Sequence, residues 1–223
     1  MPRTRRPLPL LIALLAAAGP AAATAVAADT VADRVFGANL LNGVARPGSL
    51  EYRYELRGEA GTEPVTSRVA MEVREVEPSG DKRVWFDMFE GPNRRQFGPM
   101  EAREQNPLVI VFLQRDVAGM GNLSGGQAGY FQQQIRRAFA QPAEVAPIEV
   151  QVGGRAIRAT RVVMRPFRDD PAIARFPKFK DKAYEFVVAP EVPGGLYRIA
   201  SSTPGADGRV VLEESMTFER ATP

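Results

Sequence analysis

Residues 49–57 read SLEYRYELR, and from residue 50 onward apolar and charged side chains alternate at every position. The apolar members of this stretch are Leu50, Tyr52, Tyr54 and Leu56. Successive side chains of a β-strand point to opposite faces, so this period of two predicts a strand with one buried and one solvated face. A half-buried strand is stable only beside other strands, and the rest of the chain contains segments of the same kind.

Seven further segments have strand patterns and are separated by turn residues. We expect these strands at 68–76, 83–89, 146–152, 155–165, 183–189, 196–203 and 209–218. Gly153-Gly154 is typical of a tight hairpin turn between two of them. Because the connections between neighbours are short, we expect one antiparallel sheet.

Helical patterns occur near the beginning and in the middle of the chain. Residues 29–41 predict a short helix with Thr30 as its N-cap. Asn106-Pro107 is typical of a helix start, and residues 108–120 then place an apolar stripe on one side. The run Val109-Ile110-Val111 is equally compatible with a buried strand.

A second mid-chain helix is expected after a glycine-rich connector. Ser124 and Gln127 have the spacing of a capping box, and Pro142 ends the helix. The order of elements predicts an α+β protein, mainly β, with a curved antiparallel sheet or half-barrel of about eight strands. The N-terminal helix and the two mid-chain helices would cover one face, and residues 29–223 would form this single domain.

Residues 1–28 have the three parts of a secretory signal peptide, namely a basic start, an apolar run and small residues before an A-x-A pattern. The apolar run, Leu8 to Ala18, is shorter than the roughly 20 residues that a membrane span needs. A retained hydrophobic anchor is the alternative. We therefore expect cleavage after export, a periplasmic or secreted location, and no transmembrane span in the mature chain.

The composition excludes several classes of function. The chain has no histidine and no cysteine, so it lacks the usual general base, the commonest metal ligand and the thiolate nucleophile. We expect no enzyme activity, no metal and no cofactor. The chain has 29 basic and 26 acidic residues, but residues 1–28 contain three arginines and no acid, which leaves 26 against 26. A neutral mature chain gives no reason to expect nucleic acid as a partner.

Aromatic side chains on the predicted strands and helices are the candidate apolar site. A wide curved sheet with a small helical cover would leave a concave apolar space, where a lipid or acyl chain could bind. The candidate ligand-binding residues are Tyr52, Tyr54, Phe86, Phe112, Phe131, Tyr184 and Phe186. The alternative is that they form an ordinary core between the sheet and the helices.

The segment 165–182 interleaves phenylalanines with six cations and three aspartates. Its candidate contacts with an anionic lipid headgroup or an acidic partner are Arg168, Arg175, Lys178 and Lys180. The alternative is a loop that its phenylalanines hold against the sheet while its charges remain solvated.

Two adjacent acidic pairs are the candidates for carboxylate chemistry, which is the third possible function. Neighbours in a strand point to opposite faces, so Glu213 and Glu214 are not expected to share a site. Asp169-Asp170 precedes Pro171 and is more typical of a turn.

The order of these elements resembles that of the periplasmic lipoprotein carriers, the LolA/LolB-like fold. The resemblance rests on the opening helix, on residues 49–56 as first strand and on the paired helices between residues 107 and 141. It implies an open half-barrel whose helices cover an apolar cavity for a lipid or a lipidated protein. Residues 106–136 also resemble an uncharacterised bacterial exported family. The alternative function is an envelope scaffold or accessory protein that binds another protein without a small ligand.

Overall fold

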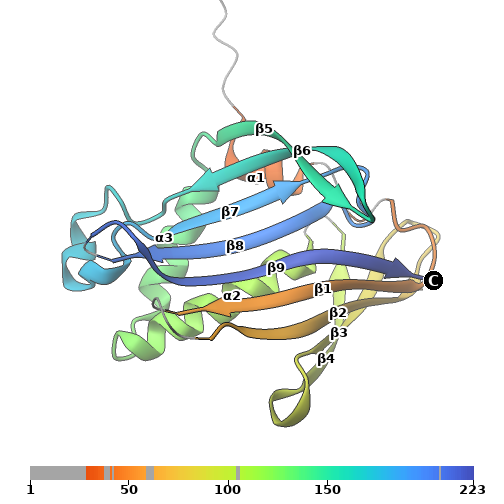
Figure 1. Cartoon of the computed structure of the whole chain (residues 1–223), viewed down its shortest axis with the longest axis horizontal. Coiled ribbons are helices and arrows are strands. Elements are labelled where there is room, and N and C mark those ends of the chain that lie inside the picture. The colour runs from red at the N-terminus through yellow and green to blue at the C-terminus, as the bar shows by residue number, and fades with distance from the viewer. Residues whose placement is uncertain (1–28, 38–40, 42, 59–62, 104–105, 206) are drawn as a thin grey trace, which may run out of the picture.

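A computed structural model describes residues 29–37, 41, 43–58, 63–103, 106–205 and 207–223. The predicted signal peptide, residues 1–28, lies outside this range. The described chain forms one open antiparallel sheet with helices on one side (Figure 1). The strands are β1 Gly48–Arg57, β2 Val65–Val76, β3 Lys82–Met88, β4 Arg95–Ala102, β5 Glu144–Val152, β6 Arg155–Met164, β7 Ala183–Val188, β8 Leu196–Pro204 and β9 Val210–Thr222.

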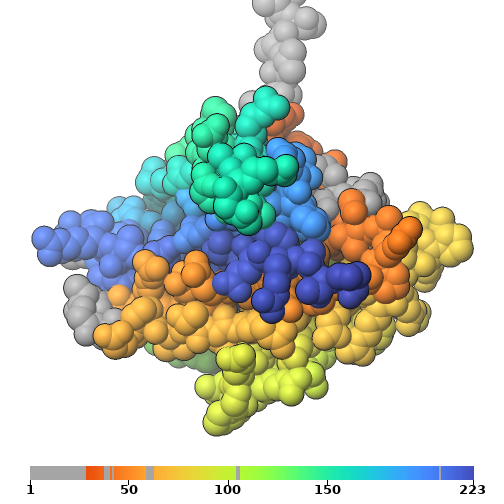
Figure 2. Space-filling model, turned by 45° about the vertical axis from the view of Figure 1, so that its right-hand side comes forward, coloured from red at the N-terminus to blue at the C-terminus, as the bar shows by residue number. Residues whose placement is uncertain are grey.

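The sheet consists of two meanders that β1 and β9 join. Its strand order is β4-β3-β2-β1-β9-β8-β7-β6-β5. The central pair is antiparallel, with Tyr54 opposite Met216 and Arg57 opposite Glu213. Figure 2 shows the side chains of β9 lying between those of β1 and β2 on one side and those of the β5–β6 hairpin on the other. The predicted α+β class with a curved antiparallel sheet is therefore confirmed.

Three α-helices cover one face of the sheet: α1 Val31–Phe36, α2 Pro107–Leu123 and α3 Ala128–Phe139. In Figure 1, α2 and α3 lie behind the sheet and form a hairpin. Short 3-10 helices are η1 Gly91–Asn93, η2 Pro171–Arg175 and η3 Pro177–Phe179.

Local capping explains two of the helix starts. The Thr30 side chain accepts a hydrogen bond from the Asp33 N–H, and Asp33 accepts one from the Thr30 N–H in return. Asn106 caps α2 by accepting from the Leu108 N–H at 2.9 Å, so residues 109–111 are helix and not strand. Both N-caps were predicted from the sequence.

The predicted capping box at the start of α3 is wrong. Ser124 ends α2, and its hydroxyl donates to the Gly121 carbonyl at 3.2 Å. Gln127 is the N-cap residue of α3, but its side chain makes no capping hydrogen bond. Because α3 begins after Gln127, Ser124 lies three residues before the N-cap position that a capping box would need it to occupy.

Strand β4 was not predicted, because Gly98 and Pro99 interrupt its sequence and most of its side chains are exposed. Proline is tolerated there because β4 is an edge strand that pairs only with β3. Gly98 has a φ of +143°, and a Cβ at this position would lie 2.7 Å from the Trp85 indole. The β3–β4 turn projects from the body of the sheet (Figure 1, Figure 2).

The outer face of the sheet, opposite the helices, carries ion pairs that cross from strand to strand. Glu185 of β7 accepts from Arg198 of β8 at 2.6 Å and also pairs with Arg161 of β6. On the other half, Asp87 of β3 pairs with Arg68 of β2 at 3.3 Å and accepts two hydrogen bonds from Arg94 in the turn before β4, at 2.8 and 2.7 Å. The Arg94 guanidinium holds the pKa of Asp87 below its usual value. Opposite charges on neighbouring strands support this register and make the outer face polar.

The opposite, helix-covered face holds the core, and Phe131 of α3 is at one of its aromatic centres. The Phe131 ring lies 5.2 Å from those of Phe176 and Phe179 and is fully buried. We expect Phe131→Ala to lower the free energy of unfolding by about 3–5 kcal/mol, because the truncation leaves a cavity. Urea denaturation measures the loss. Phe97→Ala is the control, because Phe97 is 40% exposed on β4. An equal loss in the two variants would contradict this view of the core.

Candidate binding site

All seven predicted apolar-site residues lie in the core between sheet and helices. Each side chain is at most 2% exposed, and all belong to one continuous cluster of buried apolar residues. They come from β1, β3, β7, α2 and α3, namely Tyr52 and Tyr54, Phe86, Tyr184 and Phe186, Phe112, and Phe131. The structure thus brings all of them to the expected face. Their role in ligand binding stays a prediction.

A polar cluster at the middle of α2 is buried within this apolar layer. The Asp116 carboxylate pairs with the Lys182 ammonium at 2.9 Å, and the two side chains are 7% and 2% exposed. Asp116 also accepts from the hydroxyls of Tyr184 and Ser201. Lys182 donates in addition to Ser201 at 3.2 Å and to Thr203 at 3.4 Å. These contacts compensate both buried charges and connect α2 to β8 and to the residues at the start of β7.

Arg115, the preceding residue, makes a second link between α2 and the sheet. Its Nε donates to Glu214 of β9 at 2.6 Å, and its Nη2 donates to the Tyr54 hydroxyl at 3.0 Å. The guanidinium also lies over the Phe89 ring, 4.8 Å from its centre. Phe89 follows β3 with a φ of +66°, and its ring packs edge-on against Tyr54 at 4.9 Å. In a regular strand over residues 83–89, Phe89 would lie on the face opposite to Phe86, so this contact was not predicted.

A pocket of about 310 Å³ opens beside these two ion pairs, between the end of α2, η3 and β9. Arg115, Asp116, Lys182 and Glu214 provide its polar side. Its apolar side is formed by Met120, Leu123, Phe179 and Leu212, while Ala118, Gly119 and Asn122 complete the lining. Met120 and Phe179 also belong to the core cluster, so the pocket wall continues into the aromatic layer.

The tyrosines beside the polar cluster stay protonated far above neutral pH. Burial raises the pKa of Tyr54 to about 12, and the charge of Glu214 adds to this effect while Arg115 opposes it. Burial also raises the pKa of Tyr184, and its hydrogen bond to Asp116 raises it further. Both hydroxyls therefore act as hydrogen-bond donors or acceptors and not as bases.

The four predicted contact cations are all exposed on the segment 165–182, and the phenylalanines of that segment hold it in place. Phe167 and Phe179 are buried, and Phe176 is half-buried. The structure therefore shows the packing expected for the alternative interpretation, in which the phenylalanines hold this loop against the sheet. It also leaves Arg168, Arg175, Lys178 and Lys180 in solvent, so their role as contacts stays a prediction.

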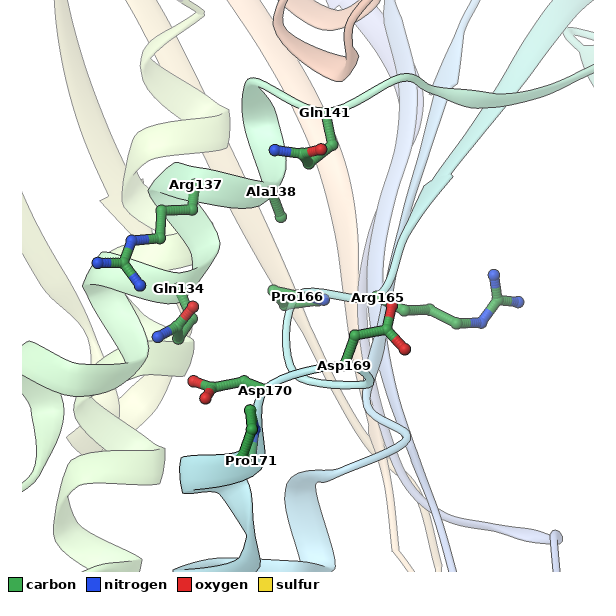
Figure 3. Close-up of a pocket in the computed structure, with 9 residues that line it drawn as sticks. All are labelled: Gln134, Arg137, Ala138, Gln141, Arg165, Pro166, Asp169, Asp170 and Pro171. Atoms are coloured by element: carbon green, nitrogen blue, oxygen red, sulfur yellow. The ribbon is translucent and has the colours of Figure 1, made fainter.

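A second, more polar pocket of about 410 Å³ lies between α3 and residues 165–171 (Figure 3). Figure 3 shows Gln134 and Arg137 on one side, Asp169 and Asp170 on the other, and Arg165 pointing away. Asp170 caps η2 through the Ala172 N–H at 2.9 Å and accepts from the Tyr130 hydroxyl at 3.0 Å. Its oxygens are thus engaged in structural contacts.

The other acidic pair is divided between the two faces, as the strand period predicted. Glu213 pairs with Arg198 on the outer face, whereas Glu214 pairs with Arg115 under the helices. Neither acidic pair therefore places two uncommitted carboxylates in one pocket, as hydrolysis of a glycoside would need.

Comparisons with known proteins give only a distant similarity. No family model matches the chain, and no curated protein matches it. Solved structures similar to it include the crystal structure of the Mycobacterium tuberculosis lipoprotein LppX, with 10% identity and a TM-score of 0.35. The match covers 86% of this chain and 94% of that one. It is a weak resemblance. Within the described residues, no helix is long and apolar enough to cross a membrane.

The buried pair generates a prediction about stability. Asp116→Ala leaves the Lys182 ammonium buried without a counter-charge, and we expect it to lower the free energy of unfolding by about 3–5 kcal/mol. Asp116→Ala/Lys182→Met removes both charges and should be more stable than Asp116→Ala alone. Denaturant titration compares the three proteins. Asp29→Ala is the control, since its pair with Arg34 is half-exposed and is worth at most about 1 kcal/mol. A double variant less stable than the single one would refute the proposed compensation.

The raised pKa of Tyr54 generates a prediction about alkaline stability. The unfolded phenol loses its proton near pH 10 and the native one near pH 12, so stability falls as the pH rises through this interval. We expect Tyr54→Phe to flatten this fall by up to about 2–3 kcal/mol, although it is less stable at pH 8 because Arg115 loses a partner. Urea titrations at pH 8, 10 and 12 give the difference. If the free energy of unfolding changes with pH in the same way in both proteins, the pKa of Tyr54 is not raised by folding.

Proposed function

We propose that this protein is an exported binding protein for an amphipathic ligand such as a lipid or a fatty acid. The observation that carries the proposal is the pocket between α2, η3 and β9, which is polar on one side and apolar on the other. Its apolar side continues into the aromatic layer under the helices. A ligand with a polar head and an acyl chain matches this division.

The polar side of the pocket suits a headgroup that forms hydrogen bonds. Two cations and two carboxylates lie there, and each cation is already paired with a carboxylate. The local charge is therefore balanced, and a strongly charged group would leave one member of a pair without its partner. A neutral or zwitterionic headgroup, or the carboxyl of a fatty acid in its neutral form, avoids this cost.

The acyl chain would lie along the apolar side of the pocket toward the core. Met120 and Phe179 line this side, and the Phe179 ring lies 5.2 Å from the Phe131 ring. Methionine is unbranched and adapts to different neighbours, so Met120 is the side chain best able to make room. The two ion pairs of α2 hold the helix on the sheet while the end of the helix adjusts.

The full burial of the seven aromatic residues favours a second candidate function. A core that is already occupied by side chains needs no ligand, and such a protein would bind another envelope protein through its surface. This candidate predicts that purified protein carries no lipid and has no measurable affinity for one. Measuring whether the purified protein contains or binds lipid therefore distinguishes the two functions.

The pocket offers a variant that fills it without disturbing the fold. Gly119 lies on α2, lines the pocket, and has nothing within 4 Å of the position of a Cβ. Gly129 on α3 has the same open surroundings but does not line the pocket, so it is the matched control. Replacing either glycine within a helix should also slightly favour the helix.

We expect the protein purified from its own cells to carry a lipid in native mass spectrometry and to bind a fluorescent fatty acid. Gly119→Phe should weaken the binding at least tenfold, because its side chain occupies the space for the ligand, whereas Gly129→Phe should leave the affinity unchanged. Titration of fluorescence measures both. Absence of lipid together with absence of binding by the unaltered protein would exclude this function in favour of a protein-binding role.

A further inference from the structure

We infer that the end of the molecule formed by the α2–α3 turn and by η2–η3 binds the surface of an anionic lipid bilayer. We call this end the tip surface, and its residues are Leu123, Arg168, Arg175, Lys178 and Lys180. Both parts of it lie at the same end of the sheet, opposite the C-terminus (Figure 1). They also meet at the pocket, since Leu123 and Phe179 both line it.

The exposed side chains of the tip surface carry a net positive charge. The four cations of the tip surface are exposed, and the ion pairs found in the described part of the chain include none that they make. Asp169 and Asp181 are the exposed acids of the same segment, so a positive excess remains. On the outer face of the sheet, by contrast, arginines pair with acids on neighbouring strands. Each cation beside an anionic membrane raises the partition constant about fivefold.

Aromatic rings hold two of these cations, Arg175 and Lys178, at the surface. The Arg175 guanidinium lies over the rings of Tyr130 and Phe176, at 5.7 and 5.5 Å from their centres. The Lys178 ammonium lies 5.2 Å from the centre of the Phe179 ring. Because Phe179 is buried and its ring is held by the core, this contact restricts the position of the Lys178 ammonium. Positioned cations lose less conformational freedom when they bind phosphate groups than flexible ones do.

The tip surface also carries an exposed leucine. Leu123 is 62% exposed at the last position of α2, where the helical hairpin turns. One apolar side chain among scattered cations is too small for the core of a stable protein interface, which buries about 800 Å² on each partner. It does suit a membrane, where the leucine reaches the acyl boundary and each cation finds its own phosphate. We therefore favour a bilayer over an acidic protein.

This inference rests on the proposed function, in which the pocket binds a lipid. Contact between the tip surface and a bilayer would explain how that lipid reaches the pocket. The mouth of the pocket lies beside Leu123, so a protein docked by its tip surface would hold the mouth against the headgroups. The ligand would then pass between bilayer and pocket without crossing bulk water.

Vesicle sedimentation tests the inference with charge variants that should not affect folding. Lys178→Glu/Lys180→Glu reverses two exposed cations of the tip surface, and Arg46→Glu/Arg95→Glu makes the same change in charge at exposed positions elsewhere. We expect the unaltered protein to sediment with phosphatidylglycerol vesicles but not with phosphatidylcholine vesicles. The tip variant should bind at least tenfold more weakly, and the control should bind within about twofold of the unaltered protein. Equal losses in the two variants would overturn the inference, since net charge alone would then govern binding.

A second measurement separates a bilayer from other polyanions. The chain has no cysteine, so Leu123→Cys places a polarity-sensitive dye at one position. We expect a blue shift of the dye with anionic vesicles and no shift with polyglutamate. An equal blue shift with vesicles and with polyglutamate would overturn the inference that the tip surface binds a bilayer, and would indicate an acidic polymer as its partner. Gly119→Phe should still bind vesicles, so failure of the ligand pocket and failure of the tip surface are distinguishable.

Discussion

The ion pair between Asp116 and Lys182 is the contact on which the arrangement of this protein depends. It lies inside the apolar layer and joins the middle of the covering helix α2 to the strands beneath. A buried charge is tolerated only with a well-placed partner, so the pair allows one position of the helix over the sheet. The adjacent Arg115–Glu214 pair repeats the constraint toward β9. Together the two pairs form the polar side of the pocket that opens at the end of α2.

Much of the fold could be predicted because its elements have regular periods. The alternation in residues 49–57 identified β1, and Thr30 and Asn106 identified two helix starts. The predictions were wrong or missing where a short sequence is compatible with two local structures. Ser124 can cap either of two adjoining helices, and the structure uses it for the first. The Gly98-Pro99 step resembles a turn but belongs to an edge strand.

The seven predicted ligand-binding residues lie in the core beside the candidate site, and none of them lines the pocket between α2, η3 and β9. The strand and helix periods placed the seven aromatic residues on the buried face, where the structure has them. The polar side of the pocket was not predicted, although two signals for it exist in the sequence. Asp116 interrupts the apolar stripe of α2, four residues from Phe112 and from Met120, and Lys182 shares the alternation of Tyr184 and Phe186. Each signal alone looks like an error in the pattern. Their connection requires the contact between α2 and the residues at the start of β7, which sequence periodicity does not specify.

If the proposed function is correct, an amphipathic molecule occupies the space between α2, η3 and β9. Methyl NMR of the methionines tests it directly, because Met120 lines this pocket while Met100 lies on β4 at the edge of the sheet. On addition of a fatty acid, we expect a large shift of the Met120 methyl resonance and no change in the Met100 resonance. Resonances that stay in place for every methionine, or a shift at Met100 without one at Met120, would contradict it.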